Sequence, residues 1–137
     1  MEFHANAQKL YVELSKFLMS DKYVPKKWRS VVTYPILNRM DDFFDLIEEA
    51  NSIYPYTEEE VALRREKQRL CITLCEQIYG RLTRTMLTVW WDVLHRDEHN
   101  AERVKLEKHI TELGDMLDRE ITLLKGWRKS TKLLHRK

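Results

Sequence analysis

The chain has 137 residues, 43% of them hydrophobic, and its 24 basic and 22 acidic residues leave a net charge of +2. This length supports one domain with a hydrophobic core and is short for two. With three Gly, three Pro and 34% charged residues, the composition is typical of long helices, and we expect an all-α protein. The small net charge argues against a strongly basic protein.

Signals for export or membrane insertion are lacking in the sequence. The first residues, MEFHANAQ, contain no basic region followed by an apolar stretch, and no run of about 18 apolar residues occurs. We therefore expect a soluble, cytoplasmic protein without a membrane partner.

Two amphipathic segments are predicted before residue 52. Apolar residues recur on one helical face between about residues 5 and 20, and SDKYVPKK ends this first segment. Pro25 opens the second segment, because proline fits the first turn of a helix. Since Pro35 lies inside this segment and lacks a backbone donor, we expect a kink or a new start near residues 32–35. The apolar stripe of the second segment consists of Ile36, Met40, Phe43, Phe44 and Ile47.

A capping box predicts where the third helix begins. The Thr57 hydroxyl can accept from a free backbone N–H while Glu60 reaches back to the cap. The apolar stripe that follows predicts a helix over about residues 58–94, roughly 55 Å at 1.5 Å per residue. After HRDEHN, a fourth helix carries an apolar stripe from Leu106 to Trp127.

Four helices with single apolar stripes and short connections predict an antiparallel, up-down-up-down four-helix bundle. We expect one such domain over residues 1–137, ending in a basic C-terminal tail at about residues 125–137.

Patterns that would indicate catalysis or metal binding are weak. Cys71 and Cys75 lie one helical turn apart in the apolar stripe, which favours buried free thiols. Residues 95–99 match the H-x-x-E-H pattern of one metalloprotease class, but they fall where the apolar stripe stops, whereas a zinc site needs a rigid helix and a third ligand. The acids between residues 41 and 49 lie opposite an apolar stripe, as expected of a solvated face or an interface. We expect no enzyme activity, cofactor or metal site.

Basic residues are the remaining signal, and they gather in three clusters. The tail contributes +6 without an acid, which leaves −4 for the rest of the chain. The candidate nucleic-acid-binding residues are Lys26, Lys27, Arg29, Arg64, Arg65, Arg69, Arg128, Lys129 and Lys132. Such cations can neutralise phosphates, and we expect the three clusters to form one electrostatic surface. The alternative is that bases of the third helix, such as Arg65 and Arg69, pair with exposed acids such as Glu66.

Several short motifs, in this order, resemble those of a family of small bacterial four-helix-bundle proteins. YVPKKWRSVVTYPILNRMDDFFDLIEEAN is similar to its aromatic-Pro-Lys-Lys-aromatic-Arg opening, apolar helix and closing Ala-Asn. RREKQRLCITLCEQI resembles the Arg-rich start of its third helix, and LKGWRKS its Gly-Trp-x-Lys-Ser ending. The family includes proteins encoded in intervening sequences of large-subunit ribosomal RNA genes and the Avd accessory proteins of diversity-generating retroelements. The resemblance covers about residues 20–130.

The resemblance implies a homo-oligomer, a pentameric ring, that in the Avd branch binds nucleic acid and a reverse transcriptase through basic surfaces. Position by position, it matches three groups of the candidate residues. They are Lys26, Lys27 and Arg29 in the opening, Arg64, Arg65 and Arg69 in the third helix, and Arg128 and Lys129 in the ending.

Adjacent Trp90 and Trp91 cannot both face one core, so we expect one of them at a subunit interface.

Two functions stay open. The first is a non-enzymatic accessory protein that presents RNA or cDNA to a reverse transcriptase, its phosphate contacts positioning the strand without reading bases. The second is a helical oligomeric scaffold that docks only other proteins. A third reading places the tail, with its interleaved leucines and Trp127, on an anionic membrane.

Overall fold

The computed structural model describes residues 2–135, and every regular element within that range is helical. In chain order the elements are α1 (Glu2–Leu18), the 3₁₀ turn η1 (Lys26–Trp28), α2 (Thr33–Ser52), α3 (Glu58–Val89), the short α4 (Trp91–Leu94) and α5 (Ala101–Ser130). The prediction of an all-α protein is confirmed.

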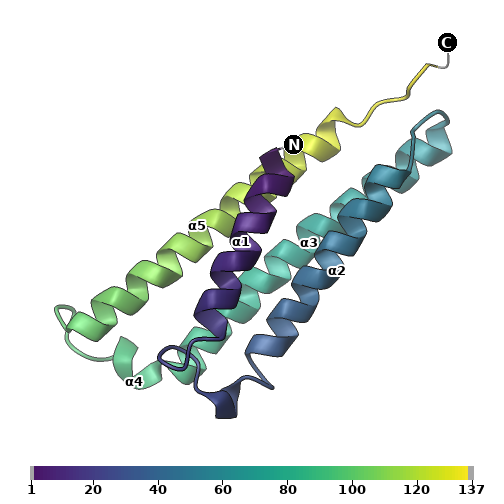
Figure 1. Cartoon of the computed structure of the whole chain (residues 1–137). Coiled ribbons are helices and arrows are strands. Elements are labelled where there is room, and N and C mark those ends of the chain that lie inside the picture. Colours follow the sequence, from purple (N-terminus) through teal and green to yellow (C-terminus); the bar gives the residue numbers. More distant parts are fainter. Residues whose placement is uncertain (1, 136–137) are drawn as a thin grey trace.

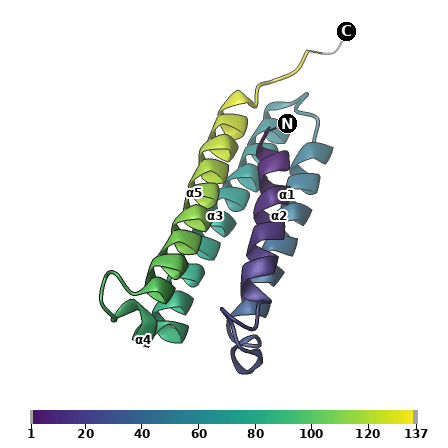
Figure 2. The same ribbon diagram turned by 60° about the vertical axis from the view of Figure 1, so that its left-hand side comes forward.

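The four long helices lie side by side, and successive long helices run in alternate directions along the molecule (Figure 1). α3 packs against α2 and α5, while α1 packs against α5 and α2. α4 lies at the same end of the molecule as the connection between α1 and α2 (Figure 2). The chain after α5 leaves the other end, near the loop between α2 and α3 (Figure 1).

α2 begins at Thr33, so Pro35 lies in its first turn. Proline is tolerated there because the first backbone N–H groups of a helix have no intrahelical partner. The buried Thr33 hydroxyl donates to the Leu18 carbonyl oxygen at 2.6 Å and so ties the start of α2 to the end of α1. The expected new start near residues 32–35 is confirmed.

α3 begins as predicted and ends earlier than predicted. Thr57 Oγ1 accepts from the Glu60 backbone N–H at 3.1 Å, and Glu60 Oε1 accepts from the Thr57 backbone N–H at 3.0 Å, which confirms the capping box. The helix ends at Val89 because Trp90 adopts φ −111° and ψ 18° and the chain turns into α4. This turn packs the Trp90 ring on Tyr23, with centroids 5.7 Å apart.

The core lies between the long helices and is apolar except at a few positions. Cys71 and Cys75 are wholly buried free thiols, as predicted, and burial raises the pKa of Cys71 to about 12. Gln68, Glu120 and Thr131 are the buried polar residues near α5. In the part of the chain that the structure describes, none of the helices has the length and apolar character to span a bilayer.

Candidate nucleic-acid interface

A groove of about 620 Å³ between α3 and α5 is lined almost entirely by cations. Helix residues four apart share a face, so Arg65 and Arg69 of α3 point to one side, as do Lys125 and Lys129 of α5. Because α3 and α5 run in opposite directions, the start of α3 lies beside the end of α5 (Figure 1). The lining residues are Arg65, Arg69, Ile72, Lys125, Arg128 and Lys129.

Within residues 2–135, four of these cations form no ion pair with a carboxylate, although the charge of Arg128 contributes to lowering the pKa of Glu66. Arg65 Nη2 donates to the Thr131 carbonyl oxygen at 2.7 Å, and Arg128 Nε donates to the Arg65 carbonyl oxygen at 3.1 Å. Both bonds position a guanidinium without neutralising it. Lys125 and Lys129 are exposed, and no ion pair engages either lysine within residues 2–135.

Arg69 is engaged within its own helix. Its Nε and Nη2 donate to the Glu66 carboxylate at 2.9 and 2.6 Å, and this hydrogen bonding lowers the pKa of Glu66. The pairing that was the alternative interpretation of the third-helix bases is therefore found at Arg69 and not at Arg65.

The chain after α5 is fixed against the molecule beside this groove. The buried Thr131 hydroxyl donates to Gln68 Oε1 at 3.0 Å, and the Leu134 backbone N–H donates to the Pro55 carbonyl oxygen at 2.8 Å. Lys132 lies between these two bonds and is exposed. The last two cations of the predicted basic tail, at positions 136 and 137, lie outside the described residues.

Arg64 does not line the groove. Its Nη1 donates to the Ile53 carbonyl oxygen at 2.9 Å, and its guanidinium lies 5.8 Å from the centroid of the Trp127 ring. Burial lowers the pKa of Arg64 below its usual value. These contacts hold the loop between α2 and α3 to the end of α5, so the side chain has a structural task.

The basic cluster around Trp28 lies at the far end of the molecule from the groove (Figure 1). The 20 residues of α2 separate the two places, about 30 Å at 1.5 Å per residue. Lys26 and Lys27 are exposed there, and Lys27 Nζ lies 5.9 Å from the Trp28 ring centroid. The prediction that all three clusters form one surface is therefore wrong for a single chain.

Arg29, in that cluster, is also tied within the chain. Its Nη2 donates to the Met19 carbonyl oxygen at 2.8 Å and pairs with Asp21 at 2.6 Å, which leaves 12% of its side chain exposed. It fixes the connection between α1 and α2 instead of presenting a free charge.

The two adjacent tryptophans point apart, as their neighbouring positions require. Trp90 packs on Tyr23, whereas Trp91 is 55% exposed and its ring lies 4.0 Å from that of His95. A subunit interface at Trp91 stays a prediction.

His95 and His99 lie in the exposed segment after α4, where His99 contacts Glu98 at 3.4 Å. Among the residues described, His, Cys, Asp and Glu do not form any group of three or more that could hold a metal ion.

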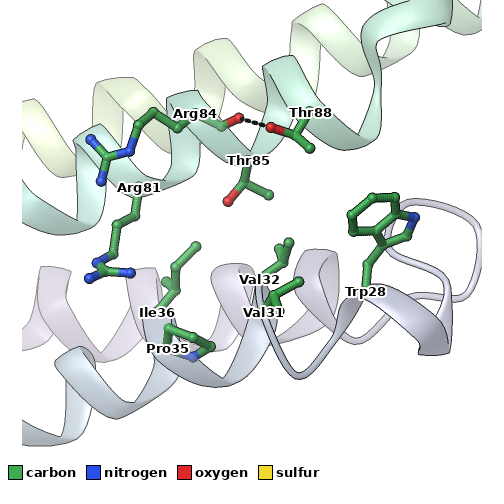
Figure 3. Close-up of a pocket in the computed structure, with 9 residues that line it drawn as sticks. All are labelled: Trp28, Val31, Val32, Pro35, Ile36, Arg81, Arg84, Thr85 and Thr88. Carbon is green, nitrogen blue, oxygen red and sulfur yellow. Dashed lines mark hydrogen bonds between the residues drawn. The ribbon is translucent and has the colours of Figure 1, made fainter.

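A second groove lies between α2 and α3 (Figure 3). Arg81 and Arg84, three residues apart on α3, line it, and they also line an adjoining hollow with Arg39 of α2. Helical spacing relates Arg81 to Arg84, and likewise Lys125 to Lys129, but only the packing shows what each pair faces.

Comparisons with protein-family models, curated proteins and solved structures found no match to this chain.

Proposed function

We propose that this protein is a non-enzymatic accessory protein that binds the backbone of RNA or DNA in the groove between α3 and α5. The supporting observation is that Arg65, Lys125, Arg128 and Lys129 line one groove and form no ion pair within the described chain. Cations so placed bind phosphates and release counterions, which gives affinity without reading base sequence.

The small net charge of +2 does not oppose this proposal. Affinity for a nucleic-acid backbone depends on how many phosphates are neutralised locally, and the acids of this chain lie largely elsewhere, for example along the outer face of α2. The apolar Ile72 at the groove also leaves the cations without a competing carboxylate from that position.

The resemblance to the Avd branch extends the proposal to a partner and an assembly. In this proposal the long helices form an up-down-up-down four-helix bundle, the bundles form a pentameric ring, and the bound strand is the template RNA or cDNA of a retroelement reverse transcriptase. The alternating directions of the long helices support the up-down-up-down bundle. A ring would repeat the groove around its axis, so that modest contacts combine by multivalency.

A matched pair of double variants tests the site. Lys125→Gln with Lys129→Gln removes two charges from the groove, while Lys26→Gln with Lys27→Gln removes the same charge from the other end. We expect the first variant to weaken binding of a single-stranded RNA about tenfold, or about 1.4 kcal/mol, by fluorescence anisotropy, and the second to change it much less. Both should keep the far-UV circular dichroism of the parent, because exposed charges contribute little to stability.

Equal losses in the two variants would contradict the assignment of the groove. If the parent binds neither single-stranded nor structured RNA at about 50 mM salt, where electrostatic binding is strong, the nucleic-acid proposal fails. The second candidate, a scaffold that docks proteins, then takes its place. It is favoured by the exposed apolar surface beside the arginines of the α2/α3 groove.

A further inference from the structure

The groove between α2 and α3 changes in character along its length. One end is apolar, with Trp28, Val31 and Pro35, and 64% of Val31 is exposed. The other end is cationic. Arg81 lies there near the level of Ile36 (Figure 3), and Arg39 of α2 lines the hollow together with Arg81 and Arg84. The apolar hollow, about 350 Å³, and the cationic one, about 500 Å³, adjoin each other, because Arg81 and Arg84 line both.

In the described part of the chain, the arginines of this groove form no ion pair. Arg81 and Arg84 form no ion pair within residues 2–135, and Arg39 Nη1 donates only to the Pro35 carbonyl oxygen, at 3.4 Å. Glu76 lines the cationic end but pairs with none of them. Unpaired cations next to exposed apolar side chains are typical of a surface that is covered by something else.

The outer face of α2 carries an aromatic residue followed by acids, and so it complements the groove, which is first apolar and then cationic. Five exposed residues recur there at helical spacing and therefore share one face. They are Tyr34, Asn38, Asp41, Asp45 and Glu48. No ion pair engages the three acids anywhere in the chain from residue 2 to 135. Along α2 the aromatic residue comes first and the acids follow, just as the apolar end of the groove precedes its cationic end.

We propose that the α2/α3 groove receives the Tyr34–Glu48 face of α2 from a second copy of this chain. The groove and the face are different surfaces, so the contact is heterologous, and its repetition gives a closed ring or a filament. The inference rests on the assembly in the proposed function, and not on nucleic-acid binding.

The order of the two surfaces favours the closed ring. In a ring whose axis runs along the helices, copies are related by rotation without translation, so each residue meets groove residues at its own level. Tyr34 of the second copy then lies beside Val31 and Pro35. Asp41 of the second copy lies beside Arg39, at the cationic end. With the helix reversed, the acids would instead meet Trp28 and the apolar end.

Charge reversal tests this interface by sedimentation velocity and light scattering. The face variant is Asp41→Arg with Asp45→Arg, and the groove variant is Arg39→Glu with Arg81→Glu. Each alone places like charges together and should be a monomer at micromolar concentration, whereas the parent is an oligomer. The chain that carries all four changes should assemble again, because it restores opposite charges at every contact of the ring.

The control is Glu112→Arg with Asp118→Arg, which reverses two exposed charges on α5 and should leave assembly intact. Far-UV circular dichroism and thermal melting establish that each variant folds. An oligomeric parent whose face and groove variants still assemble would overturn this interface alone. A monomeric parent would overturn the assembly and this inference together, while RNA binding by the α3/α5 groove would stand. A groove variant that loses RNA affinity without any change in assembly would assign the groove to nucleic acid and overturn the inference.

Discussion

The side-chain amide of Asn6 in α1 donates a hydrogen bond of 3.2 Å to Oε1 of Glu120 in α5, where the carboxyl group is wholly buried. The same amide nitrogen lies 3.2 Å from the Met116 carbonyl oxygen, and Glu120 Oε2 has no hydrogen-bond partner. Burial raises the pKa of Glu120 to about 7, because one hydrogen bond does not replace the lost hydration of a carboxylate.

This carboxyl group makes stability depend on pH. The folded pKa lies above the unfolded one, so the folded state binds the proton more tightly, and stability falls as the pH rises from about 4.5 to about 7. Glu120→Gln keeps the shape and removes the charge. We expect it to raise the free energy of unfolding at pH 8, on the order of 3 kcal/mol, and to change it little at pH 4.5. Urea denaturation at both pH values measures this, with Glu112→Gln as the exposed control; an equal effect at both pH values would contradict it.

The proposed phosphate contacts of the groove predict how RNA affinity depends on salt. We expect the slope of log affinity against log salt to flatten by about 1.4 to 1.8 for Lys125→Gln with Lys129→Gln, since each lost contact contributes about 0.7 to 0.9. Anisotropy titrations between about 50 and 200 mM salt measure the slope. An unchanged slope together with weaker binding would mean that the two lysines act through the fold and not through phosphate.

The capping box at the start of α3 predicts a defined loss of stability. Thr57→Ala removes the acceptor for the Glu60 backbone N–H and should lower the free energy of unfolding by about 1 kcal/mol. Thr111→Ala is the matched control, because Thr111 is exposed within α5 and caps nothing. Urea denaturation should find the control at least as stable as the parent.

Gly126 is a position where a side chain would stabilise the protein. It lies inside α5, is exposed, and a Cβ there would meet no atom within 4 Å. Gly126→Ala should therefore raise the free energy of unfolding by about 0.5 to 1 kcal/mol, through the lower backbone entropy of the unfolded chain. Gly114→Ala should gain less, because its Cβ would lie 3.4 Å from Tyr79 Oη. Thermal melts of the two variants should differ in that order.

Local signals in the sequence predicted local structure well. The Thr57 capping box and the new start at Pro35 depend on neighbouring residues, and both lie where expected. The site was harder to predict, because it depends on residues far apart in sequence. Lys125 lines the groove because α5 packs against the start of α3. Lys26 lies far from the groove, because the full length of α2 separates them.

The spacing of Glu120 in the sequence indicates that it is buried. It lies seven residues after Leu113 and four before Leu124, in step with the apolar stripe of α5. A charged residue in that register predicts a buried acid. By contrast, nothing in the spacing distinguishes Arg64, which packs against Trp127, from Arg65, which lines the groove one residue later.

Arg65 lines the groove and also donates a hydrogen bond to the Thr131 carbonyl oxygen. The same guanidinium therefore connects the groove to the chain after α5. In the proposed function, a phosphate that takes the Nη2 donor competes with that carbonyl oxygen, and we expect it to weaken the attachment of the chain after α5. Coupling of this kind is reciprocal: whatever loosens the segment from Thr131 to Leu134 frees Arg65 and raises its affinity for an anion. The Leu134 amide is hydrogen-bonded to the Pro55 carbonyl oxygen and lies outside the groove. Faster hydrogen exchange at this amide would then indicate that an anion occupies the groove.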